Sequence, residues 1–328
     1  MKKQILFSLL LCLAVNLFAE GKLIKAWNFE NSSNMQVYPA NSVLELDDEE
    51  FHQGKKSLVF TPDNNCCVYF WQKVTANTKY TVTFWYKTDK APIKRCGMTI
   101  NFKTADGKNI SQHQPLADVC QADNAWHEAK FEFTAPEGAV NSQVILNFLR
   151  CNTTVFIDEF RFYDESVQIE TAPLPTEPVS KGKLVRAYTF ENMRNIYRDP
   201  KGEFAILKDE TLGKNYLAFT ADLNYSAYFY LPVQPGKEYQ AEFLYRIDGD
   251  ILQRCGFTLF YTSKGAKRGD LGMLHVSAKD LKPSNGKWTH GTFKFKAPEK
   301  IHSCQFIVNF FRCNVNADIA DLKIFEEP

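Results

Sequence analysis

The second half of this chain repeats the sequence motifs of the first half, and this internal duplication constrains the fold more than any other feature. Residues 21–31 read GKLIKAWNFEN and return as GKLVRAYTFEN at residues 182–192. Later in each copy, VILNFLRCN at residues 144–152 matches FIVNFFRCN at residues 306–314. The period of about 160 residues is much longer than that of solenoid repeats, so we predict that each copy is a complete domain.

Short alternating runs of residues that favour β-structure fill each copy. Three of them in the first copy are YTVTFWYKT, KFEFTAPEG and VFIDEFRFY. Apolar residues at every second position indicate strands with one buried face. The 27 Phe and 14 Tyr residues also favour β-structure, and no segment carries a sustained helical stripe. The pattern predicts an all-β chain in which each copy is an antiparallel sandwich of about eight or more strands.

The first residues are typical of a secretory signal peptide. A lysine pair precedes a mostly apolar run from Ile5 to Phe18, and the small residue Ala19 follows at the boundary. This run is too short to span a membrane comfortably, and the bulky Leu11 precedes Cys12, where lipid attachment favours a small residue. We therefore predict that residues 1–19 direct export, to the periplasm or out of the cell.

The rest of the chain is predicted to form two domains, at residues 20–165 and 182–328. Between them, residues 166–181 contain three prolines among polar residues, which is typical of a semi-extended linker. No second apolar stretch is long enough to span a bilayer, so we expect no membrane span.

Charge and motifs argue against several classes of function. The 39 Lys+Arg residues nearly balance the 38 Asp+Glu residues, so no charge field favours nucleic acid or an anionic membrane. The sequence has no metalloprotease, nucleophile-elbow or phosphate-loop motif. No histidine falls at an equivalent position of the other copy when the sequences are compared; the six are His52, His113, His127, His275, His290 and His302. We therefore predict that the protein is not an enzyme.

Eight cysteines remain once the signal peptide is removed, and an even number permits disulfides in an exported chain. Cys96 and Cys151 recur as Cys255 and Cys313, so the repeat predicts the bridges Cys96–Cys151 and Cys255–Cys313. Reduced cysteines in the core are the alternative. The other four have no equivalents, and their pairing stays open, with a bridge from Cys120 to Cys66 or Cys67 as one option; these four are Cys66, Cys67, Cys120 and Cys304.

Several short motifs lie in the same order in both copies. In the first copy they are FE at residues 29–30, GKKSL at 54–58, YTVTFWY at 80–86, FEFTAP at 131–136 and VFIDEF at 155–160. The second copy repeats most of them. With these motifs, each copy resembles the CenC-type carbohydrate-binding modules of families four and nine. The resemblance implies that the fold is two tandem jelly-roll β-sandwiches and that the partner is a polysaccharide or oligosaccharide.

The resemblance also implies a structural calcium ion in each domain. Related modules hold it with the Glu after the opening Phe, an Asp of the last strand and loop carbonyl groups, and Ca²⁺ takes six to eight oxygen ligands. The matching residues are Glu30 and Asp158 in the first copy. In the second copy Glu191 matches, but Ala320 stands at the Asp position and Asp321 is the nearby acid.

A glycan-binding face needs aromatic platforms and planar polar groups, and Arg is a rigid donor for hydroxyl oxygens. Tyr69 and Trp71 are two residues apart and are predicted to share one strand face, as are Tyr228 and Tyr230. The candidate ligand-binding residues that recur are Tyr69, Trp71, Arg95 and Arg150, with Tyr228, Tyr230, Arg254 and Arg312. The alternative is that the aromatic residues lie in the core or at an edge and the arginines form ion pairs.

Two further expectations concern the direction of side chains. If Cys96 and Cys151 point inward, alternation places the neighbouring arginines on the opposite face and Asn147 on the side of the cysteines. Trp126 and Trp288 precede the KFEFTAP and TFKFKAP strands and are expected in the core.

Taken together, these patterns predict a secreted, non-catalytic protein that binds a polysaccharide through one groove in each copy. The competing hypothesis is a structural or adhesion protein whose sandwiches bind a protein partner or act as spacers. Exposure of the recurring aromatic residues favours binding, whereas burial favours the spacer.

Overall fold

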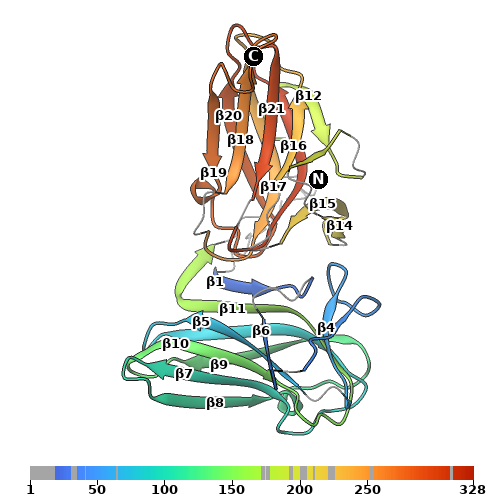
Figure 1. Ribbon diagram of the computed structural model, residues 1–328, viewed down its shortest axis with the longest axis vertical. Coiled ribbons are helices and arrows are strands. Elements are labelled where there is room, and N and C mark those ends of the chain that lie inside the picture. The colour runs from blue at the N-terminus through green and yellow to red at the C-terminus, as the bar shows by residue number, and fades with distance from the viewer. Residues whose placement is uncertain are drawn as a thin grey trace, which may run out of the picture.

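The computed structural model contains two β-sandwiches built in the same way, one for each copy of the repeat (Figure 1). It describes residues 19–30, 35–40, 42–63, 66–170, 174, 178–191, 195–199, 205–209, 211–220, 226–251, 255–310 and 313–328. Each sandwich pairs a six-stranded with a five-stranded antiparallel sheet, which confirms the all-β prediction. Among these residues, no helix is long and apolar enough to cross a membrane. The predicted signal peptide lies almost wholly outside them.

The six-stranded sheet of the first sandwich has the order β3-β4-β11-β6-β9, and β1 pairs with β11. Its strands are β1 (Ala19–Trp27), β3 (Leu46–Asp47), β4 (Ser57–Phe60), β6 (Lys79–Lys87), β9 (Trp126–Thr134) and β11 (Val155–Glu170). The five-stranded sheet has the order β2-β5-β10-β7-β8. Its strands are β2 (Gln36–Tyr38), β5 (Cys67–Lys73), β7 (Gly97–Thr104), β8 (Asn109–Pro115) and β10 (Ala139–Asn147), and a short 3₁₀ helix, η1 (Leu116–Asp118), follows β8.

The second sandwich repeats this topology strand for strand. Its six-stranded sheet has the order β14-β15-β22-β17-β20 with β12 against β22, and its five-stranded sheet has the order β13-β16-β21-β18-β19. The strands of the first are β12 (Lys183–Tyr188), β14 (Ala205–Asp209), β15 (Lys214–Phe219), β17 (Glu238–Ile247), β20 (Thr289–Lys296) and β22 (Ala317–Glu326). Those of the second are β13 (Tyr197–Asp199), β16 (Ser226–Leu231), β18 (Gly256–Thr262), β19 (Met273–Ser277) and β21 (Ser303–Asn309), with η2 (Ala278–Asp280) after β19.

The alternating pattern gives each sandwich a core of its own. On β6, Val82 and Phe84 are fully buried, and the Phe84 ring stacks on Phe160 of β11 with centroids 5.8 Å apart. From the facing sheet, Val144 and Leu146 of β10 are also fully buried. Burial of each such side chain contributes about 2 kcal/mol to stability. On β10 the alternate residues Gln143, Ile145 and Asn147 are only half-buried on the outer face.

The end of the first domain differs from the prediction. Strand β11 runs to Glu170, because residues 19–21 of β1 pair with residues 168–170, so the first third of the predicted linker is β-strand.

The last part of the linker is hydrogen-bonded to the second sandwich. Glu242 is buried on β17, and its carboxylate accepts hydrogen bonds from the backbone N–H groups of Val179 and Ser180. A buried carboxylate needs such partners, and here the chain entering the second copy supplies them.

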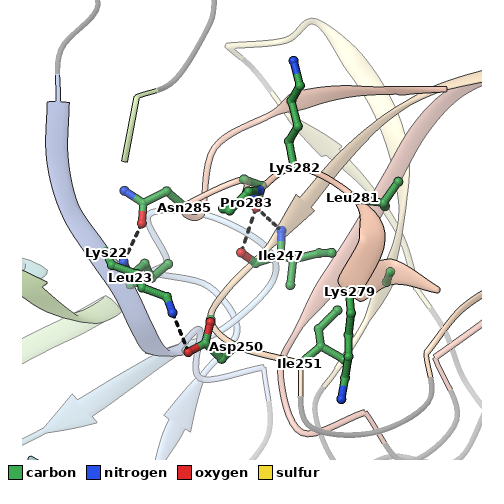
Figure 2. Close-up of a pocket in the computed structure, with 13 residues that line it drawn as sticks. Lys22, Leu23, Ile247, Asp250, Ile251, Lys279, Leu281, Lys282, Pro283 and Asn285 are labelled. Atoms are coloured by element: carbon green, nitrogen blue, oxygen red, sulfur yellow. Dashed lines mark hydrogen bonds and ion pairs between the residues drawn. The ribbon is translucent and has the colours of Figure 1, made fainter. Parts of the chain in front are cut away.

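The two sandwiches lie crosswise and meet at strand β1 (Figure 1). Figure 2 shows part of this contact: the Asn285 side chain accepts a hydrogen bond from Leu23 N–H. The same side chain also donates a hydrogen bond of 3.0 Å to the Gly21 carbonyl oxygen. One amide group therefore pairs with β1 much as a neighbouring strand would. Lys22 adds an ion pair of 2.8 Å with Asp250. Asn285 is buried and has a φ of 53°.

We expect Asn285→Gly to loosen this contact without unfolding either sandwich. Glycine tolerates the positive φ, so the change removes two hydrogen bonds and little else. At about 1 kcal/mol for each bond, hydrogen exchange of the Leu23 amide should become about 30-fold faster. Asn124→Gly is the matched control, because Asn124 also has a positive φ, of 63°, but its side chain is exposed. Equal Leu23 exchange in both variants would contradict the role of Asn285.

Candidate functional site

The outward face of the five-stranded sheet in the first copy carries aromatic and polar side chains in two rows. One row runs across four strands through Trp71, Gln143, Asn101 and Ser111. Trp71 is 45% exposed, and the ammonium group of Lys103 lies 5.6 Å from the centroid of its ring. The indole ring is thus presented to solvent and held beside a cation.

The next row passes through Gln36, Tyr69, Ile145, Thr99 and His113. We call these two rows, with Lys103, the first sheet face. Tyr69 is half-buried, and the Thr99 hydroxyl lies 3.0 Å from Nδ1 of His113. Tyr69 and Trp71 therefore project on the same side of β5, as their spacing predicts, and neither belongs to the core.

Hydrogen bonds fix the polar side chains of the first sheet face. Asn101 donates from Nδ2 to Oε1 of Gln143 over 3.4 Å, and the Ser111 hydroxyl donates to Oδ1 of Asn101 over 2.7 Å. Nε2 of His113 lies 3.0 Å from the Lys94 carbonyl oxygen. The face is therefore a preorganised set of amide and hydroxyl groups beside two aromatic rings, a combination suited to hydroxyl-rich ligands.

The equivalent face of the second copy, which we call the second sheet face, is more aromatic. Tyr197 stacks on Tyr228 with centroids 5.1 Å apart, and Tyr230 meets both rings edge-on. Tyr230 is 52% exposed and lies beside Gln305, the equivalent of Gln143. Phe260 replaces Asn101 and has the Arg268 guanidinium 4.2 Å from its ring centroid. The two faces place equivalent residues on equivalent strands, but the second is less polar than the first.

The predicted arginines lie away from the middle of the face. Arg95 and Arg150 are exposed, in the turns just beyond the paired residues Asn147 and Gly97, at one end of the sheet. Arg254 and Arg312 lie outside the described residues. The first two can therefore reach a ligand only where it passes the end of the sheet.

The predicted direction of Asn147 was wrong. Asn147 lies in the same outward series of β10 as Gln143 and Ile145, not on the side of the buried Cys151. The reason is the turn that follows: Arg150 has a φ of 56°, so simple alternation does not continue from β10 to the cysteine.

The comparison of histidines was also wrong, because two of them are equivalent. His113 pairs with Thr99 across β8 and β7, and His275 pairs with Thr258 across β19 and β18. In both copies the threonine hydroxyl lies 3.0 Å from Nδ1 of the histidine. A longer β18–β19 loop hides this equivalence in the sequence. Other residues of the two faces that went unrecognised are Gln36, Thr99, Asn101, Lys103, Ser111, Gln143, Tyr197, Thr258, Phe260 and Gln305.

Trp126 and Trp288 are half-buried and lie outside the two main cores, in contrast to the prediction. Trp126 lies near His52, with ring centroids 5.8 Å apart. Trp288 packs edge-on against Tyr216 and donates its indole N–H to Asp209 over 2.7 Å. Trp126 is the first residue of β9, paired with Lys87, and Trp288 directly precedes β20, so both lie where a strand begins.

The repeated cysteine pairs lie together in the structure as thiols. Cys96 is hydrogen-bonded to Cys151, and Cys255 to Cys313, and both contacts raise the pKa of the first member, together with burial. The bridges themselves stay a prediction. The cysteines without equivalents are also thiols; they are Cys66, Cys67, Cys120 and Cys304.

The two acids expected to hold calcium in the first copy both accept hydrogen bonds from the backbone of the loop at residues 52–56. Glu30 accepts backbone N–H groups of Lys55 and Lys56, and Asp158 accepts those of His52 and Gln53. Asp158 is fully buried, which raises its pKa well above the ordinary value although these N–H groups lower it. No group of three or more acid, His or Cys side chains suited to a metal occurs among the described residues. The two acids alone fit Ca²⁺ poorly, and calcium stays a prediction.

The second copy departs further from that pattern. Glu191 is exposed, and Asp321 binds the ammonium groups of Lys214 and Lys323, which lower its pKa although burial raises it. Asp321 is the structural equivalent of Glu159, since both have a φ of 48° in the last strand. Two ammonium groups already neutralise this carboxylate, so it does not fit a cation.

Glu159 should make the first sandwich sensitive to acid. Burial raises its pKa, but Arg161 at 2.9 Å and the hydrogen bond with His52 outweigh this and lower it to about 2. A lowered pKa stabilises the fold above the unfolded value of 4.5, and this stability is lost as the pH falls towards 2. As the pH falls from 4.5 to about 2, we expect wild type to lose about 2 kcal/mol more of unfolding free energy than Glu159→Gln. Chemical denaturation at several pH values measures this, with the exposed Glu137→Gln as control. Parallel curves for wild type and Glu159→Gln would contradict it.

Comparison with known proteins gives one family match. Residues 19–150 match the sequence model of a carbohydrate binding domain, that of modules of families four and nine. No curated protein matches the chain.

Several solved structures resemble the chain weakly. The tandem pair of family 22 modules of Xyn10C from Paenibacillus barcinonensis covers 94% of this chain and 98% of its own length, at 13% identity and a TM-score of 0.36. The first, xylan-binding module of that protein covers 44% of this chain and 96% of its own length, at 14% identity and a TM-score of 0.34. The C-terminal family 22 module of Clostridium thermocellum Xyn10B covers 45% of this chain and 98% of its own length, at 10% identity and a TM-score of 0.32. Similarities this weak carry no argument about the ligand.

Proposed function

Because residues 19–150 carry a carbohydrate-binding domain of families four and nine, we propose that this protein binds a polysaccharide through its first and second sheet faces. The observation that carries the proposal is the exposed Trp71 beside Tyr69 and the hydrogen-bonded Gln143 and Asn101. An aromatic ring stacks on the apolar C–H face of a sugar, and amide groups exchange hydrogen bonds with its hydroxyls. The second sheet face offers Tyr197, Tyr228 and Tyr230 for the same purpose.

In this proposal the protein is exported, carries no catalytic group of its own and acts by holding a polymer. Two faces in one chain allow two contacts with one polysaccharide, so that overall affinity exceeds that of either face. The contact through Asn285 limits how freely the faces reorient, which favours polymers that match their fixed spacing. The alternative, a spacer or adhesion protein that binds another protein, is favoured only if no polymer binds.

Affinity electrophoresis of residues 20–328 tests the proposal. Gels containing plant, algal or host polysaccharides are run with and without a calcium chelator. We expect one polymer class to retard the protein and Lys103→Ala to weaken retardation about threefold, because the cation beside Trp71 is lost. Lys130→Ala is the matched control, as an exposed lysine on β9 of the other sheet. Free migration of the folded protein through every gel would overturn the proposal, and loss of retardation with the chelator alone would support a calcium ion.

A further inference from the structure

A cleft between the two copies is separate from both sheet faces. It has a volume of about 770 Å³. The first copy lines it with residues 51–55, Trp85 of β6 and Arg161 of β11, and the second with residues 206–209, Arg246 of β17 and Trp288. We call this the interdomain cleft. Its volume lies in the range of small-ligand sites, which occur preferentially between domains.

Indole rings from both copies line the interdomain cleft. Trp85 is half-buried and is stacked on the His52 ring, with centroids 3.8 Å apart and planes at 10°. Trp288 is held by the Arg246 guanidinium, 4.9 Å from its ring centroid, and by its hydrogen bond to Asp209. Both rings are fixed by their neighbours, so a ligand that contacts them meets platforms that are already in place.

The lining of the interdomain cleft is positively charged. It includes five lysine or arginine residues and two acids, not counting His52. Each acid lies against an arginine: Glu159 is 2.9 Å from Arg161, and Asp209 is 3.3 Å from Arg246. The lining charge sums to plus three, and to plus two when Asp318, which pairs with Arg246 at 2.7 Å, is also counted. Low-dielectric walls strengthen such a field for a ligand of opposite sign.

The loop that forms the wall of the first copy is anchored on both sides. Asp158 holds the backbone of His52 and Gln53, and the Gln53 side chain donates to Asp209 of the second copy over 3.1 Å. Lys55 follows on the same loop and is exposed, with its backbone N–H bound by Glu30 at 2.7 Å. The positive side chain of Lys55 thus extends from a fixed backbone at the mouth of the cleft.

We propose that the interdomain cleft binds a short acidic oligosaccharide, with sugar rings against Trp85 or Trp288 and uronic-acid carboxylates beside Lys55 and the other cations. The aromatic rings select a ligand with apolar ring faces over a simple inorganic anion, and the charge selects an acidic sugar over a neutral one. This site goes beyond the sheet-face function, because neither tryptophan lies on those faces.

Isothermal titration calorimetry of the full chain, without its signal peptide, tests this site. The probe is the trimer of galacturonic acid, compared with the trimer of galactose, which lacks the carboxylates. We expect the acidic trimer alone to bind, about tenfold more weakly when salt rises from 20 to 200 mM. Lys55→Glu should weaken binding about tenfold or more, while Lys55→Arg retains it.

Two controls separate this site from the sheet faces. Lys108→Glu makes the same charge change on an exposed hairpin turn of the first copy and should leave binding of the acidic trimer unchanged. Trp71→Ala reports on the first sheet face and should also leave it unchanged, even if polysaccharide retardation is lost. Equal binding of the neutral trimer, no binding by wild type, or full binding by a folded Lys55→Glu variant would each overturn the proposal.

Discussion

The double variant Trp71→Ala, Tyr230→Ala is expected to migrate through polysaccharide gels as if no polymer were present. Each side chain is the most exposed ring among the residues that define its sheet face, at 45% and 52%. Tyr38 of β2 is 59% exposed but lies beyond those rows, opposite Cys67. Truncation of an aromatic residue at the centre of a binding site costs about 2 kcal/mol or more, a loss of about 30-fold at each face. Loss of both faces also removes the gain from two-point attachment.

The single variants and a control make this result specific. Trp71→Ala and Tyr230→Ala should each retain part of the retardation, because the other face still binds. Val140→Ala shortens another exposed apolar side chain, 48% accessible on β10 of the same sheet, and should migrate like wild type. Since these side chains are exposed, thermal transitions should change little. Unchanged retardation of a folded double variant would show that the polymer binds elsewhere.

Arg246→Leu should cost the second sandwich about 3–5 kcal/mol of unfolding free energy. Arg246 is 9% exposed, and it pairs with Asp318 at 2.7 Å and Asp209 at 3.3 Å. Its guanidinium also lies 5.4 Å from the Tyr216 ring centroid. Leucine restores part of the volume but leaves two buried carboxylates without their cation, and an unpaired buried charge is costly.

The repeat supplies a matched control for this substitution. Lys87 stands at the equivalent position of the first copy and pairs with Glu50 at 2.6 Å, but the Glu50 side chain is 43% exposed. Solvent screens that pair, so Lys87→Leu should cost no more than about 1 kcal/mol. Urea denaturation of both variants measures the difference, and equal losses would contradict the account of the buried network.

The effect of Arg246→Leu should also depend on pH. Burial raises the pKa of Asp318 to about 7 even though Arg246 lowers it, and removal of Arg246 should raise it further. A carboxyl with a raised pKa favours the fold when protonated, so its contribution is present below the unfolded value of 3.8 and is lost as the pH rises through about 7. The variant should therefore lose less unfolding free energy relative to wild type at pH 5 than at pH 8. A loss that is constant across this range would contradict the assignment to Asp318.

The duplication and the alternating strands could be predicted from the sequence because each is a local pattern. The shared face of Tyr69 and Trp71 followed from the same period of two. The position of Asn147 could not be predicted, because the positive φ of Arg150 has no reliable signal in a non-glycine residue. The equivalence of His113 and His275 was hidden because four residues join β7 to β8, whereas ten join β18 to β19.

The contact between the copies was the least predictable part. Asn285, Gln53 and Arg246 lie far from their partners in sequence, and nothing local marks an asparagine that pairs with a strand 262 residues away. The proline-containing linker suggested independent domains, whereas β11 extends to residue 170 and Glu242 holds the chain that enters the second copy. Long-range polar contacts of this kind depend on the tertiary arrangement, which a single sequence does not contain.

A crystal structure of the chain with an oligosaccharide of the polymer class that retards it would test the central claim most directly. The account predicts a sugar ring stacked on Trp71, with hydroxyl groups bonded to Gln143 and Asn101, and a second sugar against Tyr230 of the other copy. A sugar bound only to loops, to the six-stranded sheets or to the interdomain cleft, with both sheet faces empty, would contradict it.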